Sequence, residues 1–470
     1  MIQLVWFRQD LRIADNPALA SAAARGPVLP FYILDETAAG GEGHGAASRW
    51  WLHQSLLELR RNLGSLYLLK GDPSALVPAL ARRVEAGGVF WNRRYEPLAI
   101  ERDKLIKERL KSSGLLVRSS NSALLFEPWT VRAEENAPFT VFTPFWQSCL
   151  RRSITAPLAP LPLRLANLPD AGERLEDWAL EPTDPDWASR FKLSWRPGER
   201  GAQERLAEFV STGIEGYRKF RDFPALRNVS RLSPHLHWGE ISPRQVWHAV
   251  ERRVNVKPDL RADADKFLSE LGWREFAHYL LFNFPKLPTA NWRSEFDAYP
   301  WTGDAAHLAA WQRGRTGYPF VDAGMRELWA TGYLSNRARL VAASFLVKHL
   351  RIHWREGLAW FHDTLLDADL ANNCAGWQWV AGSGADAAGY SRIFNPIEQG
   401  RKFDPEGEYV RRWCPELARL PGDVIHAPFE ASASVQRQAE VELGVTYPYP
   451  IVNHAQARQA ALDAYAAIKG

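Results

Sequence analysis

The chain has 470 residues, 46% of them hydrophobic and 24% charged, a composition and length typical of a globular protein with more than one domain. The net charge of +4 is too small to indicate a nucleic-acid-binding protein by itself, so only local clusters of charge are informative. Three well-separated cysteines, Cys149, Cys374 and Cys414, exclude a disulfide framework and a four-cysteine iron–sulfur cluster and favour a reducing compartment.

No segment of the sequence predicts export or membrane insertion. The first ten residues become charged before an apolar signal core could form, and no later run of about 18 apolar residues occurs. We therefore expect a soluble, cytoplasmic protein that has no membrane partner and acts as a monomer.

Short apolar runs alternate with helical patterns in the first part of the chain. Asn16 followed by Pro17 is typical of a helix start, and Gly64 and Gly114 mark helix ends. Strands are predicted at residues 2–7, 28–34, 66–69, 89–91 and 115–118, with a helix after each of the first four. This alternation predicts an α/β domain with a doubly wound, five-stranded parallel sheet over residues 1–127. Because no Gly-x-Gly-x-x-Gly follows the first strand, a nicotinamide dehydrogenase is disfavoured.

The remaining chain predicts a linker and a second domain. Residues 128–197 lose the periodicity and contain recurrent prolines, which indicates a long interdomain connection. Beyond Glu199 the pattern is helical almost to the end, with no convincing strand alternation. We therefore predict that residues 198–470 form a larger, all-α domain.

Residues 217–233 carry several cations, followed by hydroxyl side chains at a predicted helix start. Backbone N–H groups, hydroxyls and an arginine at a helix N-terminus suit a pyrophosphate, because the donors and the helix dipole both favour an anion. A capped surface helix explains this motif equally well when it is taken alone.

Glu270 and Trp273 are three residues apart and therefore lie on one face of a predicted helix. A pocket for an extruded nucleotide needs an aromatic plane that stacks against the base and a carboxylate that hydrogen-bonds its edge. An ordinary network of ion pairs along a helix is the alternative for these two residues alone.

Residues 367–379 place two carboxylates, three carboxamides and two tryptophans in thirteen positions. This mixture is too polar for a core helix and too aromatic for a solvated loop, so it indicates either a planar polar ligand or a buried polar network. With Trp-Phe-Arg-Gln-Asp-Leu-Arg at 6–12 and Arg-Ile-Phe-Asn-Pro-Ile-Glu-Gln at 392–399, the segment closely resembles the DNA photolyase and cryptochrome family. The resemblance covers nearly the whole chain and is most specific between Tyr217 and Gln399.

The resemblance implies an FAD cofactor in the helical domain. It assigns Arg339 and Asp367 to the flavin ring and Asn373 to flavin N5, where an amide imposes no charge of its own. Val229 departs from the usual threonine, which removes one hydroxyl contact. The residues implied to bind FAD are Tyr217, Ser230, Arg231, Leu232, Ser233, Arg339, Asp367, Asp369 and Asn373.

The resemblance also implies a photolyase that repairs cyclobutane pyrimidine dimers in double-stranded DNA. The implied lesion-site residues are Glu270, Trp273, Asn336, Asn373 and Trp379. The implied DNA contacts are Arg221, Arg274, Arg337, Arg392 and Gln399. Neither Asn336 nor Leu340 is the histidine typical of members that repair (6-4) photoproducts, and Leu340 replaces a usual methionine while keeping the site apolar.

Two further features follow from the resemblance. Trp301, Trp354 and Trp377 fall on the family's tryptophan relay, although three tryptophans in a helical domain are ordinarily core. Residues 50–53 and 91–97 resemble class III photolyases, whose antenna pigment is 5,10-methenyltetrahydrofolate. Leu98 and Ala99 replace the Asn-Glu pair of the common bacterial folate site, so the folate contacts stay unassigned.

Other functions have less support in the sequence. A cryptochrome-type blue-light receptor that binds FAD without repair is the main alternative, favoured only by Leu340 and Val229. Gly382-Ser383-Gly384 lacks the outer glycine of a nucleophile elbow. His235 and His237 have no metal-ligand companion at useful spacing, so we expect a capping or core role for them and no metal site.

Overall fold

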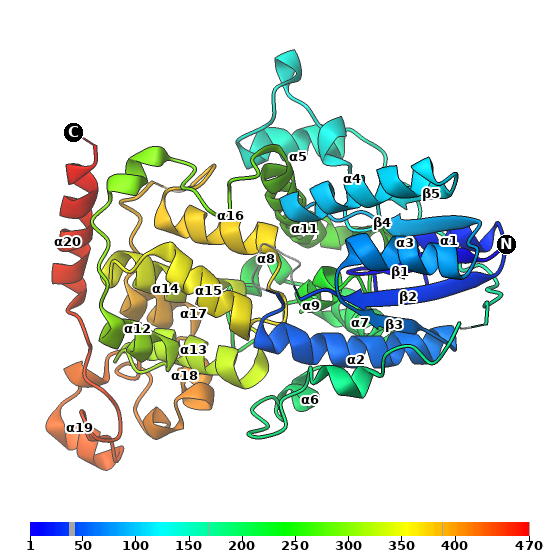
Figure 1. Cartoon of the computed structure of the whole chain (residues 1–470). Coiled ribbons are helices and arrows are strands. Elements are labelled where there is room, and N and C mark those ends of the chain that lie inside the picture. Colours follow the sequence, from blue (N-terminus) through cyan, green and yellow to red (C-terminus); the bar gives the residue numbers. More distant parts are fainter. Residues whose placement is uncertain (37–42, 168, 388, 470) are drawn as a thin grey trace. The chain divides into compact units, whose positions relative to one another are not determined.

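The structure, a computed structural model, describes residues 1–36, 43–167, 169–387 and 389–469. The described residues form two compact units that do not follow the order of the chain (Figure 1). Unit 1 comprises Met1–Glu215, Ser230–Pro285 and Leu366–Ala371, and unit 2 comprises Gly216–Val229, Lys286–Leu365 and Asn372–Gly470. Each unit is therefore assembled from segments that are distant in sequence.

Unit 1 contains a parallel sheet with the strand order β3-β2-β1-β4-β5 (Figure 1). Its strands are β1 (Gln3–Phe7), β2 (Val28–Leu34), β3 (Tyr67–Lys70), β4 (Gly88–Asn92) and β5 (Leu116–Ser120). The helices between them are α1 (Pro17–Ala23), α2 (Ala46–Leu63), α3 (Pro73–Arg83) and α4 (Pro97–Ser112). The predicted doubly wound α/β fold is confirmed, because each predicted strand lies within two residues of an observed one.

Local chemistry explains where these helices begin and end. The Asn16 side chain accepts the N–H of Leu19, at 3.1 Å, at the start of α1, and Asp72 accepts the N–H of Ser74, at 2.8 Å, at the start of α3. Each of these caps is followed by proline, which suits the first helical position. At the other end of α2, Gly64 has φ 85°, a left-handed conformation that glycine adopts without strain.

The sheet is buried on both faces, as the nearly continuous apolar strands predict. Alternate residues of the strands, such as Leu4, Trp6, Phe31 and Trp91, pack with apolar side chains of α3 and α4 in one hydrophobic core. Helix α1 covers the opposite face of the sheet, where it packs against β1 and β4. This arrangement leaves the carboxyl ends of the strands as the place for polar groups.

The rest of unit 1 is helical. Residues 128–197 include α5 (Phe142–Leu150) and α6 (Phe191–Ser194) besides irregular backbone. The helices that follow in this unit are α7 (Glu199–Glu208), α9 (Ser233–His237), α10 (Pro243–Val256) and α11 (Arg261–Asn283). Because α5 packs against α11, the predicted linker contributes directly to the helical part of the unit.

Unit 2 has no β-strand among its described residues, in agreement with the predicted all-α fold of this part of the chain. Its helices are α8 (Tyr217–Phe220), α12 (Ala305–Gln312), α13 (Pro319–Thr331), α14 (Asn336–Ser344), α15 (Trp354–Thr364), most of α16 (Leu370–Ala381), α17 (Pro396–Phe403), α18 (Glu408–Trp413), α19 (Ala433–Gln438) and α20 (His454–Ala467). None of the described helices is long and apolar enough to span a bilayer.

A buried carboxylate ties the C-terminal segment of unit 2 to α13. Asp322 is fully buried and accepts the N–H and the hydroxyl of Thr316, both at 2.7 Å, and the hydroxyl of Tyr447 at 2.5 Å. Gly317 has φ 79°, and a Cβ there would lie 2.4 Å from the carbonyl oxygen of Tyr449. The turn therefore requires glycine for both its conformation and its contact.

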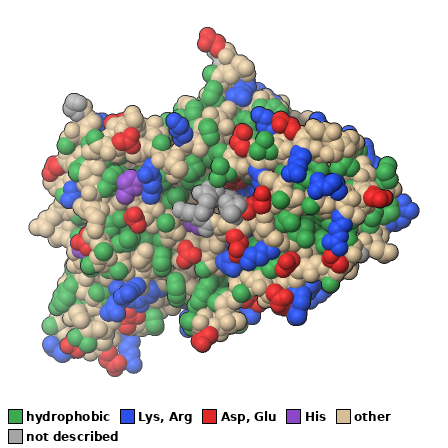
Figure 2. Space-filling view, in the orientation of Figure 1, with side chains coloured by type: hydrophobic (Ala, Val, Ile, Leu, Met, Phe, Trp, Pro, Cys, Tyr) green, Lys and Arg blue, Asp and Glu red, His purple; other side chains and the backbone are tan. Residues whose placement is uncertain are grey.

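Charged side chains of both signs are mixed on the face shown in Figure 2, where lysine and arginine side chains are interspersed with acidic ones. This distribution agrees with the small net charge of +4. Any binding of a polyanion must therefore depend on a few positioned cations.

Candidate functional site

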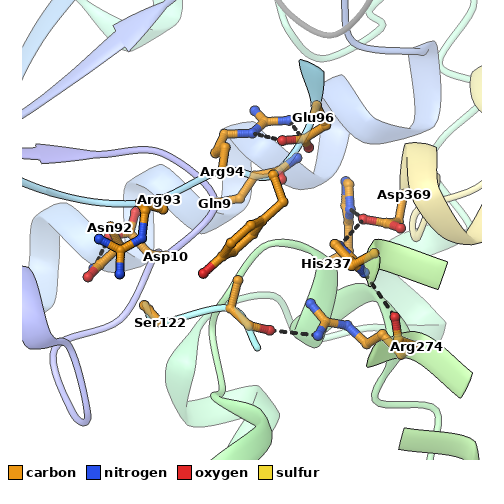
Figure 3. A pocket seen from close by; sticks show the side chains of 13 residues that line it. Gln9, Asp10, Asn92, Arg93, Arg94, Glu96, Ser122, His237, Arg274 and Asp369 are labelled. Carbon is orange, nitrogen blue, oxygen red and sulfur yellow. Dashed lines mark hydrogen bonds and ion pairs between the residues drawn. The ribbon is translucent and has the colours of Figure 1, made fainter. Parts of the chain in front are cut away.

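A pocket in unit 1 opens at the carboxyl end of the sheet, where β1 and β4 are neighbours and the strand order reverses. Ligands of doubly wound sheets bind at this position. Its lining includes Gln9 and Asp10 after β1, residues 93–96 after β4, Ser122 after β5, His237 of α9, Arg274 and His278 of α11, and Asp369 (Figure 3). Residues at the carboxyl ends of the strands and Asp369 of the 367–379 segment therefore line the same pocket.

Two acidic groups of this pocket, Glu96 and Asp369, are held in their ionised forms. Burial raises the pKa of Glu96, but the ion pair with Arg94, at 2.5 Å, outweighs it and lowers that pKa to about 2. Burial also raises the pKa of Asp369, but His278, 3.2 Å away, and His237, 3.8 Å away, hold it well below its usual range. The pocket therefore presents fixed, paired charges rather than one sign of charge.

The motif at residues 8–12 forms the base of this pocket and is structural. The Arg8 guanidinium donates two hydrogen bonds to Asp103, at 2.7 and 2.9 Å, and Asp10 accepts the side-chain amide of Asn92 at 2.6 Å. Arg12 is buried and donates to the carbonyl oxygens of four residues. These bonds fix the backbone beyond β1.

The predicted phosphate segment, residues 230–233, also lies in unit 1. The N–H of Leu232 donates to the Ser230 hydroxyl at 3.4 Å, and α9 begins at Ser233. Arg231 adopts a left-handed backbone with φ 52°, a conformation that costs a non-glycine residue energy, and its guanidinium lies 4.3 Å from the ring centroid of Trp195. Hydroxyls, main-chain N–H groups and a guanidinium in one tight turn fit a phosphate.

Helix α11 carries the predicted base-contacting pair. Glu270 forms an ion pair with Lys266, at 2.7 Å, and Trp273 lies parallel to Phe142 with 3.9 Å between ring centroids. Arg274, a predicted DNA contact, is largely buried. Its guanidinium donates to the carbonyl oxygen of Ala123, in the loop after β5, at 2.6 Å. Its guanidinium thus fixes the loop and lines the pocket.

In unit 2, Arg337 is held at the centre of a small cluster. Its guanidinium donates to Asp222 at 2.6 Å and to the Gln399 side chain at 3.4 Å, and it lies 4.2 Å from the ring centroid of Phe403. These contacts join α14, α17 and the segment after α8. Two residues predicted to contact DNA, Arg337 and Gln399, are therefore side by side.

The other predicted DNA contacts of unit 2 differ in exposure. Arg221 is buried, and its guanidinium lies 5.5 Å from the ring centroid of Tyr217 on the preceding helix α8. Arg392 is exposed and lies 5.9 Å from the ring centroid of Phe394. Arg392 is thus accessible to a phosphate, whereas Arg221 is better placed to orient Tyr217.

Three predicted flavin or lesion residues lie at or near helix starts in unit 2. Asn336 is the first residue of α14, and Arg339, one turn later, donates to the carbonyl oxygen of Leu334 at 3.2 Å. The amide nitrogen of Asn373 donates to the carbonyl oxygen of Leu358 at 3.2 Å. The side-chain oxygen of Asn373 is therefore the atom that could accept a hydrogen bond from a ligand.

The three predicted relay tryptophans follow helix α15. Trp301 lies 4.9 Å from the ring of His353, which lies 5.5 Å from Trp354, the first residue of α15. A Cβ at Gly357, one turn further on, would lie 2.1 Å from the indole of Trp377, so that indole rests directly on the helix. Trp301 and Trp354 thus both contact His353, and Trp377 packs on the helix that begins at Trp354.

Comparison with known proteins decides which family combines these features. Residues 3–163 match the family model described as DNA photolyase, and residues 267–467 match the FAD binding domain of DNA photolyase. A deoxyribodipyrimidine photo-lyase of Agrobacterium fabrum is 48% identical over 478 residues, covering 99% of this chain and 98% of that protein. The chain belongs to the DNA photolyase family.

Two further matches agree with this membership. The photolyase chain is similar to the crystal structure of a bacterial class III photolyase from Agrobacterium tumefaciens, with a TM-score of 0.95, 48% identity, and coverage of 99% and 97% of the two chains. Cryptochrome-2 of Arabidopsis thaliana is 41% identical over 474 residues, covering 97% of this chain and 77% of that protein. The family recognised from the motifs is therefore confirmed.

The residues predicted to bind FAD in this photolyase occur in both units, and their individual roles remain predictions. Those of unit 1 are Ser230, Arg231, Leu232, Ser233, Asp367 and Asp369, and those of unit 2 are Tyr217, Arg339 and Asn373. Within the described parts of the chain, no group of three or more His, Cys, Asp or Glu side chains could hold a metal. His235 is a core residue bonded to Glu240, as its spacing predicted.

Sequence reasoning missed two side chains that support predicted site residues. Phe142, which stacks on Trp273, lies in the proline-rich segment predicted to be a linker, where no periodic pattern indicated a helix. Asp222, which pairs with Arg337, is one acid among several cations. Neither role has a sequence signal, because each depends on a partner far away in the chain.

Proposed function

We propose that this photolyase repairs cyclobutane pyrimidine dimers in double-stranded DNA, driven by light absorbed by FAD. The observation that carries the proposal is 48% identity with a deoxyribodipyrimidine photo-lyase along nearly the whole of both chains. The chain also has the lesion-site residues that the family resemblance implies, namely Glu270, Trp273, Asn336, Asn373 and Trp379.

Each proposed lesion contact has a chemical reason. Reduced FAD, when bound, supplies the electron that splits the cyclobutane ring after absorbing light. Glu270 hydrogen-bonds a pyrimidine edge, Trp273 and Trp379 stack against its ring, and Asn336 adds a polar contact. Since the Asn373 side-chain nitrogen donates to Leu358, its oxygen would accept a hydrogen bond from a protonated flavin N5 without adding charge there. The protein therefore positions the reactants while the cofactor performs the electron transfer.

The proposed DNA contacts fall into two groups. Arg392 is exposed and contacts a phosphate directly. Arg337 is held by its ion pair with Asp222 and donates a hydrogen bond to Gln399, so both side chains are ordered before DNA arrives. The two remaining arginines, Arg221 and Arg274, are largely buried and act by orienting their neighbours. Because phosphate contacts release counterions, binding weakens as salt increases.

Trp301, Trp354 and Trp377 are proposed to carry electrons to the flavin during its photoreduction. The contacts of Trp301 and Trp354 with His353, and of Trp377 with Gly357 of α15, support this role. The relay serves to restore the reduced cofactor and is not needed in each repair cycle.

The α/β part of unit 1 is proposed to bind an antenna pigment, 5,10-methenyltetrahydrofolate. The resemblance of residues 50–53 and 91–97 to class III photolyases supports this pigment, as does 48% identity with the class III photolyase structure from Agrobacterium tumefaciens. A near-ultraviolet absorption band besides the flavin bands in the purified protein supports this pigment; a spectrum of flavin alone rejects it.

The test of the proposed function uses reduced, FAD-loaded protein and an oligonucleotide duplex with a single thymine dimer. Under blue light we expect restored thymines, measured by chromatography, and no restoration in the dark. The control is the same protein with an undamaged duplex. Binding of flavin without any repair at saturating light would favour a cryptochrome-type photoreceptor, the role suggested by 41% identity with Cryptochrome-2.

A further inference from the structure

Helix α5 of the segment between the predicted domains brings a phenylalanine against Trp273. The ring of Phe142, the first residue of α5, is parallel to the indole, with an interplanar angle of 10° and a centroid distance of 3.9 Å. The ring of Trp146, one turn later in α5, lies 6.3 Å from that of Phe142 with an interplanar angle of 13°. The rings of Trp273 and Trp146 are thus both nearly parallel to the ring of Phe142.

This stack closes one face of the Trp273 indole. At a centroid distance of 3.9 Å, the facing rings of Phe142 and Trp273 are in direct contact, so no third ring fits between them. Trp273 is nevertheless only partly buried. A nucleobase that stacks on Trp273 must therefore use the opposite face of the indole.

The position of α5 against α11 is tightly constrained. A Cβ at Gly272, the residue before Trp273, would lie 2.7 Å from the indole of Trp146, so the helices meet where α11 has no side chain. Further along α5, Phe145 packs against Phe276 and Tyr279, with ring centroids 5.1 and 4.8 Å apart. Phe142 is thus held by its helix rather than by Trp273 itself.

We propose that Phe142 is a positioning residue for the lesion: it closes one face of Trp273 and holds the indole so that its other face stacks on a pyrimidine of the dimer. This inference rests on the proposed function of dimer repair. A partly exposed indole without this support can rotate about two side-chain bonds, and binding the dimer would then have to immobilise it. Phe142 removes that cost before the DNA binds.

The first measurement compares wild-type protein with Phe142→Ala in the dark. We expect binding to a dimer-containing duplex to weaken by about twofold to tenfold, the range that corresponds to ordering one side chain. Binding to the undamaged duplex should stay the same, because phosphate contacts do not involve Trp273. Phe142→Tyr keeps the ring and should restore the dimer affinity.

Two further variants separate positioning from general packing. Phe145→Ala removes a similar side chain from the same helix, but one that packs on Phe276 and Tyr279 instead, so dimer affinity should be retained. Phe142→Leu keeps most of the buried volume without a planar face, and it should lose dimer affinity even if Phe142→Ala does not fold. In a Trp273→Ala background, replacing Phe142 should have no additional effect on dimer binding.

The outcomes are distinct. If wild-type protein does not prefer the dimer-containing duplex, the proposed repair function is wrong. If wild-type protein prefers the dimer and Phe142→Leu keeps the full preference, only the role of Phe142 is wrong. An equal loss of affinity for damaged and undamaged DNA, or the same loss with Trp273 removed, would also overturn the positioning role.

Discussion

At the scale of single residues, several tryptophans of this photolyase have defined partners. The indole N–H of Trp354 donates to the side-chain oxygen of Asn291 at 2.8 Å, and Trp377 packs between Gly357 and the ring of Phe361, 4.9 Å away. Such contacts fix the orientation of large rings that would otherwise adopt several rotamers. Fixed orientation is what an electron-transfer path and a stacking wall both require.

Replacing Trp377 by phenylalanine tests the relay. Phenylalanine keeps most of the buried volume but is much harder to oxidise than tryptophan. We expect Trp377→Phe to lose most of the photoreduction of oxidised FAD, followed by absorption under blue light. Repair by protein that has been reduced beforehand should be nearly unchanged. The matched control is Trp311→Phe, whose ring lies 6.2 Å from Trp377 and which has no assigned relay role; an equal loss of photoreduction and repair in Trp377→Phe would reject the assignment.

Gly357 offers a second test at the residue scale. An added Cβ would lie 2.1 Å from the Trp377 indole, so Gly357→Ala should destabilise unit 2 by about 1–3 kcal/mol, the usual cost of overpacking. The control is Gly376→Ala on α16, where an added Cβ meets nothing within 4 Å. That change should stabilise the helix by about 0.5–1 kcal/mol. Thermal unfolding measures both, and equal effects would contradict the contact.

At the scale of secondary-structure elements, α11 uses its faces for different tasks. Glu270 pairs with Lys266 and Trp273 stacks on Phe142, whereas Arg274 and Glu275 bond the loop after β5. Glu275 accepts the N–H groups of Leu125, at 2.9 Å, and of Phe126, at 3.3 Å. A single helix thus links the sheet domain to the residues proposed to contact DNA.

The buried Glu275 predicts how stability changes with pH. Burial raises its pKa to about 7, although Arg274 and the two main-chain N–H groups oppose the shift. Since the unfolded pKa is about 4.3, this group's contribution to stability is complete below about pH 4 and is lost as the pH rises through about 7. A shift of this size corresponds to about 4 kcal/mol.

Glu275→Gln should therefore flatten the fall in the thermal unfolding midpoint between about pH 5 and pH 8. The pKa of Asp404 in unit 2 is also raised, to about 6, mainly by burial, so a smaller dependence should remain in the variant. An identical pH dependence in wild-type protein and Glu275→Gln would show that Glu275 does not titrate in this range.

At the scale of the whole molecule, each compact unit combines distant parts of the chain. Unit 1 joins the sheet to α9, α10 and α11, and unit 2 gathers α8 with the later helices. The predicted boundaries at 127 and 197 describe composition along the chain, and they remain a prediction. The fold prediction succeeded because alternating strands and helices leave local patterns of period two and 3.6.

Sequence patterns alone determined the strands, the helix caps, the α/β and all-α classes and the family, since all of these depend on neighbouring residues or on motifs read in order. The tertiary structure decided which of these residues touch. It paired Arg337 with Asp222, brought Asp369 to the histidines of the sheet pocket, and stacked Phe142 on Trp273. Those contacts join residues about a hundred or more positions apart, and no local periodicity records them.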